Sequence, residues 1–108
     1  MCALSDILPW TGVAARIAGE QVAVFRVAED ELYVLANKDP FSGANVMSRG
    51  IVGDIGGELV VASPVYKQHF RLRDGLCLED EGVQLRTWPV RVYDGTVLIS
   101  HSAKSAAA

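Results

Sequence analysis

Four side chains of this chain are good metal ligands: the thiols of Cys2 and Cys77 and the imidazoles of His69 and His101. Two sulfur and two nitrogen donors could hold one metal centre if the fold brought them to a common point. Their surroundings favour other roles. Cys77 lies inside the apolar run 76–78, which is typical of a buried small hydrophobic residue. His69 and His101 are expected at the surface, and two widely separated cysteines are not expected to form a disulfide.

Three further clusters could bind a charged ligand. The acidic run 79–81 might suggest a cation site, but it lacks the spaced ligands of a calcium loop, so a solvated turn is expected. The glycine-rich segment 53–57 precedes a strand pattern instead of opening a helix, which does not fit a phosphate cradle. Lys67, Arg71 and Arg73 form a basic patch that could meet an acidic partner, but a solvated strand face is the preferred interpretation.

The composition limits the classes of protein that this chain can belong to. Its 108 residues include 10 Lys and Arg and 13 Asp and Glu, a net charge of −3, and half of the residues are hydrophobic. This length predicts one domain. The acidic balance argues against nucleic acid or an anionic membrane as partner. No apolar stretch reaches the roughly 18 residues of a membrane span, and the N-terminus lacks a signal-peptide pattern, so we expect a cytoplasmic protein.

Short β-rich runs between turn signals dominate the hydrophobic pattern. Asp74-Gly75 and Asp94-Gly95 are strong hairpin signals, because both residue types tolerate a positive φ. The expected strands are Val13–Ile17, Gln21–Val27, Glu31–Ala36, Glu58–Ala62, His69–Leu72, Leu76–Leu78, Gln84–Tyr93 and Thr96–Ser100. This pattern predicts an all-β fold, an antiparallel β-sandwich or partly open barrel.

Three segments interrupt the strand pattern. Residues 37–57 are too long for a hairpin loop, and Asp39-Pro40 predicts a short helix from there to about Met47. Pro89 predicts an edge position or a bulge in the last long strand. Residues 1–101 are expected to form the domain, and residues 102–108 a flexible tail.

Two segments resemble the iron-sulfur boxes of Rieske domains. Residues 39–44 (DPFSGA) match the first box, C-P-H-x-G-A, and residues 63–66 (SPVY) match the second, C-P-x-H. In a Rieske centre two cysteines bind one iron and two histidines bind the other. The four ligand positions hold Asp39, Phe41, Ser63 and Tyr66. Phenylalanine offers no donor atom, and hydroxyls replace thiolate and imidazole poorly, so we expect no cluster in this Rieske-like fold.

Whole phrases along the chain are similar to one family, the small subunit of NAD(P)H-dependent assimilatory nitrite reductase. They include residues 2–9, 21–25, 39–41, 48–50, 61–64 and 70–81. The resemblance implies a cytoplasmic partner protein without catalytic, cofactor-binding or metal-binding residues of its own. It also implies a large subunit that carries FAD, a [4Fe–4S] cluster and sirohaem, and reduces nitrite to ammonium.

The degenerate ligand positions suggest where a partner could bind. Phe41, Tyr66 and Lys67 are the candidate contacts, since exposed aromatics beside a cation are typical of interface hot spots. The aromatic rings could equally serve only to fill the space between the two loops. Two other functions stay open: a cluster-free adaptor of another oxidoreductase, and a ferredoxin-type electron carrier with a centre built from Cys2, Cys77, His69 and His101.

Overall fold

The computed structural model describes residues 2–27, 31–65 and 67–100. The regular elements of that part of the chain are mainly strands, which two 3-10 helices interrupt. None of its helices is long and apolar enough to cross a membrane. The elements are β1 (Cys2–Ala3), η1 (Leu4–Asp6), β2 (Thr11–Ile17), β3 (Glu20–Arg26), β4 (Leu32–Ala36), η2 (Met47–Arg49), β5 (Ile51–Ile55), β6 (Glu58–Ala62), β7 (His69–Arg71), β8 (Thr87–Trp88), β9 (Val90–Tyr93) and β10 (Thr96–Ile99).

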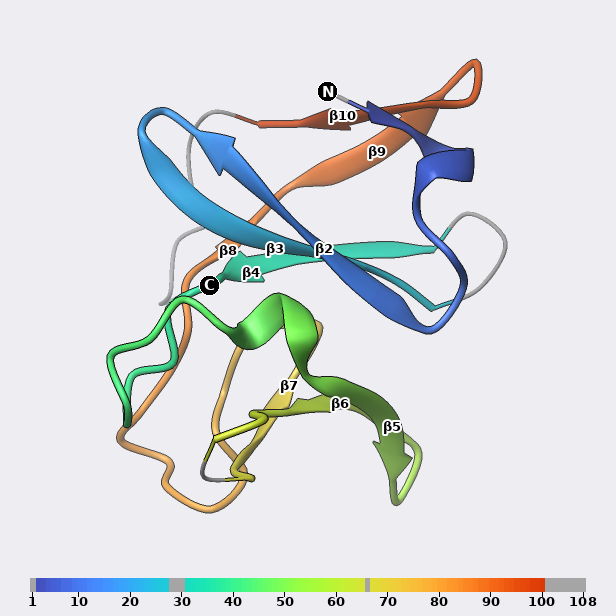
Figure 1. Ribbon diagram of the computed structural model, residues 1–108. Helices are drawn as coiled ribbons and strands as arrows, with labels where there is room; N and C mark the ends of the chain where they lie inside the picture. Colours follow the sequence, from blue (N-terminus) through green and yellow to red (C-terminus); the bar gives the residue numbers. More distant parts are fainter. Residues whose placement is uncertain (1, 28–30, 66, 101–108) are drawn as a thin grey trace.

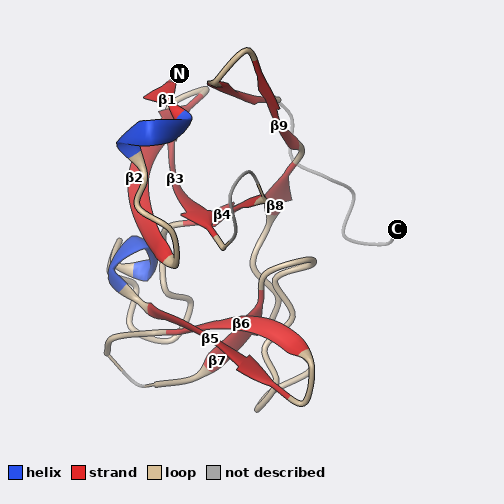
Figure 2. Ribbon diagram, turned by 90° about the vertical axis from the view of Figure 1, so that its right-hand side faces the viewer, coloured by secondary structure: helices blue, strands red, loops and turns tan. Residues whose placement is uncertain are grey.

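The strands form three antiparallel sheets with the orders β1-β10-β9, β2-β3-β4-β8 and β5-β6-β7. The first two sheets face each other in the upper part of the molecule, and the third lies below them, with η2 at the junction (Figures 1 and 2). This arrangement confirms the predicted all-β fold class. The two loops with the degenerate boxes belong to the lower part.

One hydrophobic core joins the upper and lower parts. Residues 22–25 of β3 are buried without interruption, because this strand lies between β2 and β4 and is covered on both faces. Phe25, Met47 of η2 and Phe70 of β7 are fully buried members of the same cluster. Gly12 permits this packing: a Cβ there would lie 2.6 Å from the ring of Phe25. The lower sheet is therefore fixed to the upper ones by shared apolar contacts.

The predicted helix from Asp39 to about Met47 is wrong. The backbone makes one turn there, closed by a hydrogen bond of 2.7 Å from the Gly43 N–H to the Asp39 carbonyl, and Gly43 then adopts a φ of 77°. A left-handed residue ends a helical path. The insert does contain a short helix, but it is the 3-10 turn η2 at Met47–Arg49.

The strand predictions differ from the structure in four places, one of which is the short N-terminal strand β1, which was not predicted. The run 84–93 is split at Pro89 into β8 and β9, as a residue without an N–H requires. The expected strand 76–78 makes only isolated bridges, Phe70 with Cys77 and Leu76 with Gln84. Strand β5, within the insert, was not predicted. The Asp94-Gly95 hairpin has positive φ at both residues, 52° and 74°, as its sequence indicated. The expected tail at 102–108 lies outside the described residues.

Candidate functional site

The two box-like loops are joined by a buried hydrogen bond between Asp39 and Ser63. The Ser63 hydroxyl donates to Oδ2 of Asp39 at 2.5 Å, and both residues are fully buried. These residues stand at the two positions where the Rieske boxes have cysteine. A side-chain hydrogen bond therefore connects the loops at the place where, in a Rieske centre, an iron would be bound by two thiolates.

The first loop, residues 37–46, folds around the Asp39 carboxyl group. Its Oδ1 accepts the Phe41 backbone N–H at 2.9 Å, so both carboxyl oxygens have a partner. The Asp39 N–H donates to the Ala44 carbonyl at 2.8 Å, which closes the loop on itself. Asp39 thus accepts one hydrogen bond from its own loop and one from the neighbouring loop. A buried carboxyl group needs such partners for both of its oxygens.

The second loop, residues 63–68, is closed by backbone hydrogen bonds at Ser63. Its N–H donates to the Gln68 carbonyl at 2.9 Å, and its carbonyl accepts from the Lys67 N–H at 3.1 Å. Lys67 adopts a left-handed φ of 67° and is exposed, while Val65 is 43% exposed. Tyr66, one of the predicted contacts, lies outside the described residues.

Phe41 occupies the first box's histidine position and is half-buried. Its ring lies 6.2 Å from the ring of Phe70, centroid to centroid, with a tilt of 44° between the planes. Phe41 therefore extends the core toward the loops, and such tilted aromatic pairs are favourable beyond their buried area. Asp39, Phe41 and Ser63 are brought together by the fold.

Asn37 is a site residue that the sequence did not indicate. It is buried, and its Nδ2 donates to Oε1 of Gln21 and to the Asn45 carbonyl, both at 3.2 Å. Its Oδ1 accepts the Ser48 N–H at 2.7 Å. Asn37 therefore ties the first loop to β3 and η2. Its position directly after an apolar strand was the available signal, because a buried amide there must find partners.

The histidine and cysteine of the lower part converge on a carboxylate. Glu79 accepts from the His69 backbone N–H at 2.7 Å, contacts Nδ1 of His69 at 2.6 Å and lies 3.8 Å from Sγ of Cys77. Burial acts to raise the pKa of the Glu79 carboxyl, but the hydrogen bonds from His69 outweigh it and the pKa lies below its usual range. Burial raises the pKa of the Cys77 thiol, which argues against a nucleophilic role.

The proposed four-ligand centre gains no support from these contacts. Cys2 belongs to β1, at the opposite end of the molecule from β7 and His69 (Figure 1). His101 lies outside the described residues. Among the residues that are described, no group of three His, Cys, Asp or Glu side chains, His69, Cys77 and Glu79 included, is arranged so that it could hold a metal ion.

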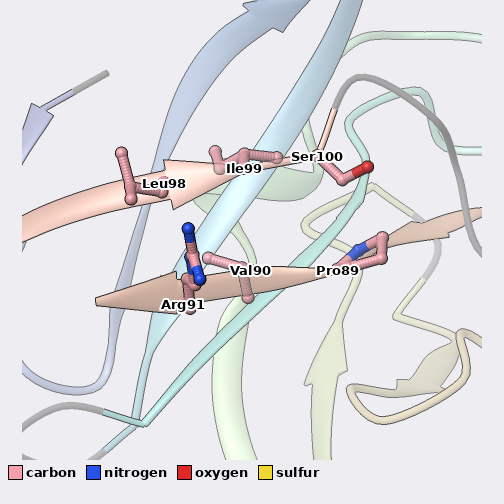
Figure 3. A pocket seen from close by; sticks show the side chains of 6 residues that line it. All are labelled: Pro89, Val90, Arg91, Leu98, Ile99 and Ser100. Atoms are coloured by element: carbon pink, nitrogen blue, oxygen red, sulfur yellow. The ribbon is translucent and has the colours of Figure 1, made fainter. Parts of the chain in front are cut away.

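An open groove of about 330 Å³ lies on the β9–β10 pair, away from the two loops. Figure 3 shows Arg91 projecting from β9 toward Leu98 of β10, with Val90 and Ile99 beside them. The lining is mainly aliphatic, and the groove shows no set of converging polar groups that would orient a small substrate.

Comparison with known proteins first defines the class. The model of the Rieske-like [2Fe-2S] domain family matches residues 1–100. The nitrite reductase (NADH) small subunit of Salmonella typhimurium is 51% identical over 98 residues, which are 90% of this chain and 91% of that protein. A solution structure of the nitrite reductase [NAD(P)H] small subunit from Erwinia carotovora is 48% identical, with a TM-score of 0.79 over 96% of this chain and 80% of that one. This chain belongs to the family of nitrite reductase small subunits.

A third relative has a different chain organisation. A Klebsiella oxytoca protein named nitrite reductase [NAD(P)H] large subunit is 45% identical over 101 residues, which are 94% of this chain and 10% of that protein. The same kind of domain thus occurs both as a separate small subunit and as a minor part of a long chain.

The residues at the box positions do not fit the [2Fe–2S] group for which the fold family is named. Asp39 and Ser63 hydrogen-bond to each other, and Phe41 packs toward Phe70 without a donor atom. A Rieske cluster needs two thiolates and two imidazoles, and none of these three side chains supplies either.

Proposed function

We propose that this chain is the small, non-catalytic subunit of a cytoplasmic NAD(P)H nitrite reductase. It docks on or stabilises a large subunit that carries FAD, a [4Fe–4S] cluster and sirohaem and performs the six-electron reduction of nitrite to ammonium. The observation that carries this proposal is the match to small subunits over nine-tenths of both chains. The Klebsiella protein supports the partner, since there a similar domain and the rest of a large subunit share one chain.

In this proposal the chain carries no redox group of its own. The donors at the box positions support this, because the Asp39–Ser63 hydrogen bond already satisfies both groups and Phe41 has none to offer. In this proposal residues 1–101 act as a single Rieske-like domain, and residues 102–108 are a tail outside it. Electrons then pass from reduced nicotinamide to nitrite within the large subunit, and this chain affects the rate only through binding.

The proposed docking surface is formed by the ends of the two loops, with Phe41, Tyr66 and Lys67 as contacts. Lys67 is exposed and makes no ion pair among the described residues, so its charge is available to an acidic group of the partner. Val65 beside it offers an exposed aliphatic side chain. Phe41 supports the loop from below through its contact with Phe70.

Reconstitution tests the proposal. The large subunit from the same organism is purified alone, and its affinity for this chain and its nitrite-dependent NADH oxidation are measured with and without the chain. We expect binding, a higher or longer-lived rate with the chain present, and no turnover by the chain alone. Lys67→Glu should weaken binding, whereas Arg91→Glu on β9 serves as the matched control. Absence of both binding and any effect on turnover would contradict the proposal.

A further inference from the structure

The turn that leads into β2 presents an exposed tryptophan in an unfavourable backbone conformation. The Thr11 N–H donates to the Leu8 carbonyl at 3.2 Å, which closes a β-turn with Pro9 and Trp10 at its centre. Trp10 has a φ of 66°, the left-handed region that the third position of a type II turn requires and that glycine fills best. Its side chain is nevertheless 54% exposed and is not packed against the core.

The surrounding contacts hold this turn in place. The Trp10 N–H donates to the Arg26 carbonyl at 2.5 Å, and the Thr11 hydroxyl donates to the Leu8 carbonyl at 2.6 Å. The Arg26 guanidinium donates to the carbonyl of fully buried Ile7 at 2.8 Å, so the segment before the turn is also fixed. Trp10 is therefore presented on a rigid support, and a strained position kept by its surroundings points to a function.

Other exposed apolar side chains belong to this turn and to the start of β5. Both views place the turn beside η2 and the start of β5 (Figures 1 and 2). A Cβ on Gly12 would lie 3.0 Å from the Ser48 carbonyl oxygen, which shows how closely β2 approaches η2. Leu8 is 70% exposed in the turn, and Ile51, the first residue of β5, is 73% exposed. Arg49, the last residue of η2 and two residues before Ile51, is exposed and makes no ion pair among the described residues.

We infer that Leu8, Trp10 and Ile51, with Arg49 at their edge, form a second docking surface for the large subunit. This inference rests on the proposed function and extends it to a surface outside the two box-like loops. Tryptophan and arginine are the residues most enriched among interface hot spots, and a rigid turn loses little entropy when it binds. The matching surface of the partner is an apolar pocket with an acidic group at its edge.

The large subunit is a better occupant than a second copy of this chain. In the Klebsiella protein a similar domain is one tenth of a large-subunit chain, so the remainder of that chain is its permanent neighbour. A second copy would bring together two chains of net charge −3, and their like net charges oppose that association.

Trp10→Gly separates binding from stability, because glycine removes the indole and suits the left-handed φ. We expect its thermal midpoint to equal or exceed that of the wild type, and its Kd for the purified large subunit to rise at least about tenfold. Ile51→Ser should weaken binding in the same direction. Tyr93→Ser is the matched control, since Tyr93 is 71% exposed on β9, which belongs to a different sheet from β2 and β5, and its loss should leave the Kd unchanged.

Each outcome decides the inference. If the wild type binds and Trp10→Gly and Ile51→Ser bind equally well, the second surface is refuted while the proposed function stands. If the wild type does not bind the large subunit, both are refuted. A wild-type dimer in sedimentation experiments that Trp10→Gly dissociates would show that a second copy is the occupant and would overturn the inference.

Discussion

Removing the Ser63 hydroxyl measures how much the Asp39–Ser63 hydrogen bond contributes to the fold. Both residues are fully buried, and the bond is 2.5 Å long, so Ser63→Ala leaves Oδ2 of Asp39 without a partner or water. A buried acceptor that is left without its hydrogen-bond partner costs about 1–3 kcal/mol. We expect Ser63→Ala to lower the free energy of unfolding by about 2–3 kcal/mol, and the thermal midpoint by roughly 10–20 °C.

Chemical denaturation followed by the fluorescence of Trp10 and Trp88 provides the assay. Ser5→Ala is the control, because Ser5 is exposed and its side chain makes no hydrogen bond with any residue that the structure describes, and its effect should stay within about 0.5 kcal/mol. In a double-mutant cycle, Asp39→Ala and Ser63→Ala should be non-additive. A cost for Ser63→Ala as small as that of Ser5→Ala, or full additivity, would refute the reasoning.

Two other contacts give independent predictions. The lowered pKa of Glu79 means that its carboxylate stabilises the fold above its ordinary pKa of 4.5, a contribution lost as pH falls through the folded value. The stability advantage over Glu79→Gln should therefore shrink in acid unfolding titrations, and a constant difference would contradict this. Gly75→Ala should destabilise by more than about 2 kcal/mol, because its Cβ would collide with the Leu85 carbonyl. Gly57→Ala, also at positive φ but with open space, should cost less; equal thermal midpoints would contradict the steric account.

Most strands were predictable because a buried strand has a recognisable apolar run in its own sequence. The central strand β3 is a continuous apolar run, and the Asp94-Gly95 turn fixes the last hairpin. Strand β5 was missed because Gly53 and Asp54 are unusual in strands and three of its five side chains are exposed. Its pairing with β6 decides its structure, and that pairing is not visible in its own residues.

In the candidate site, too, the local sequence does not determine the structure by itself. Asp39-Pro40 has the local pattern of a helix start, but the same carboxyl group can cap a turn. Whether Asp39 starts a helix or caps a turn depends on Ser63, 24 residues further along the chain, whose hydroxyl donates to the second carboxyl oxygen. The proximity of these two residues followed from the resemblance to the Rieske boxes. The role of Asn37 did not, because its partners Gln21 and Ser48 come from separate elements.

The most direct test of the central claim is the iron and acid-labile sulfide content of the chain, purified without oxygen from cells that are supplied with iron. If hydrogen bonds and aromatic packing hold the two loops, iron and sulfide should be far below one per chain. The protein should then also lack visible absorption and keep its thermal midpoint in the presence of a chelator. Two irons and two sulfides per chain, with the visible spectrum of a [2Fe–2S] cluster, would contradict the account.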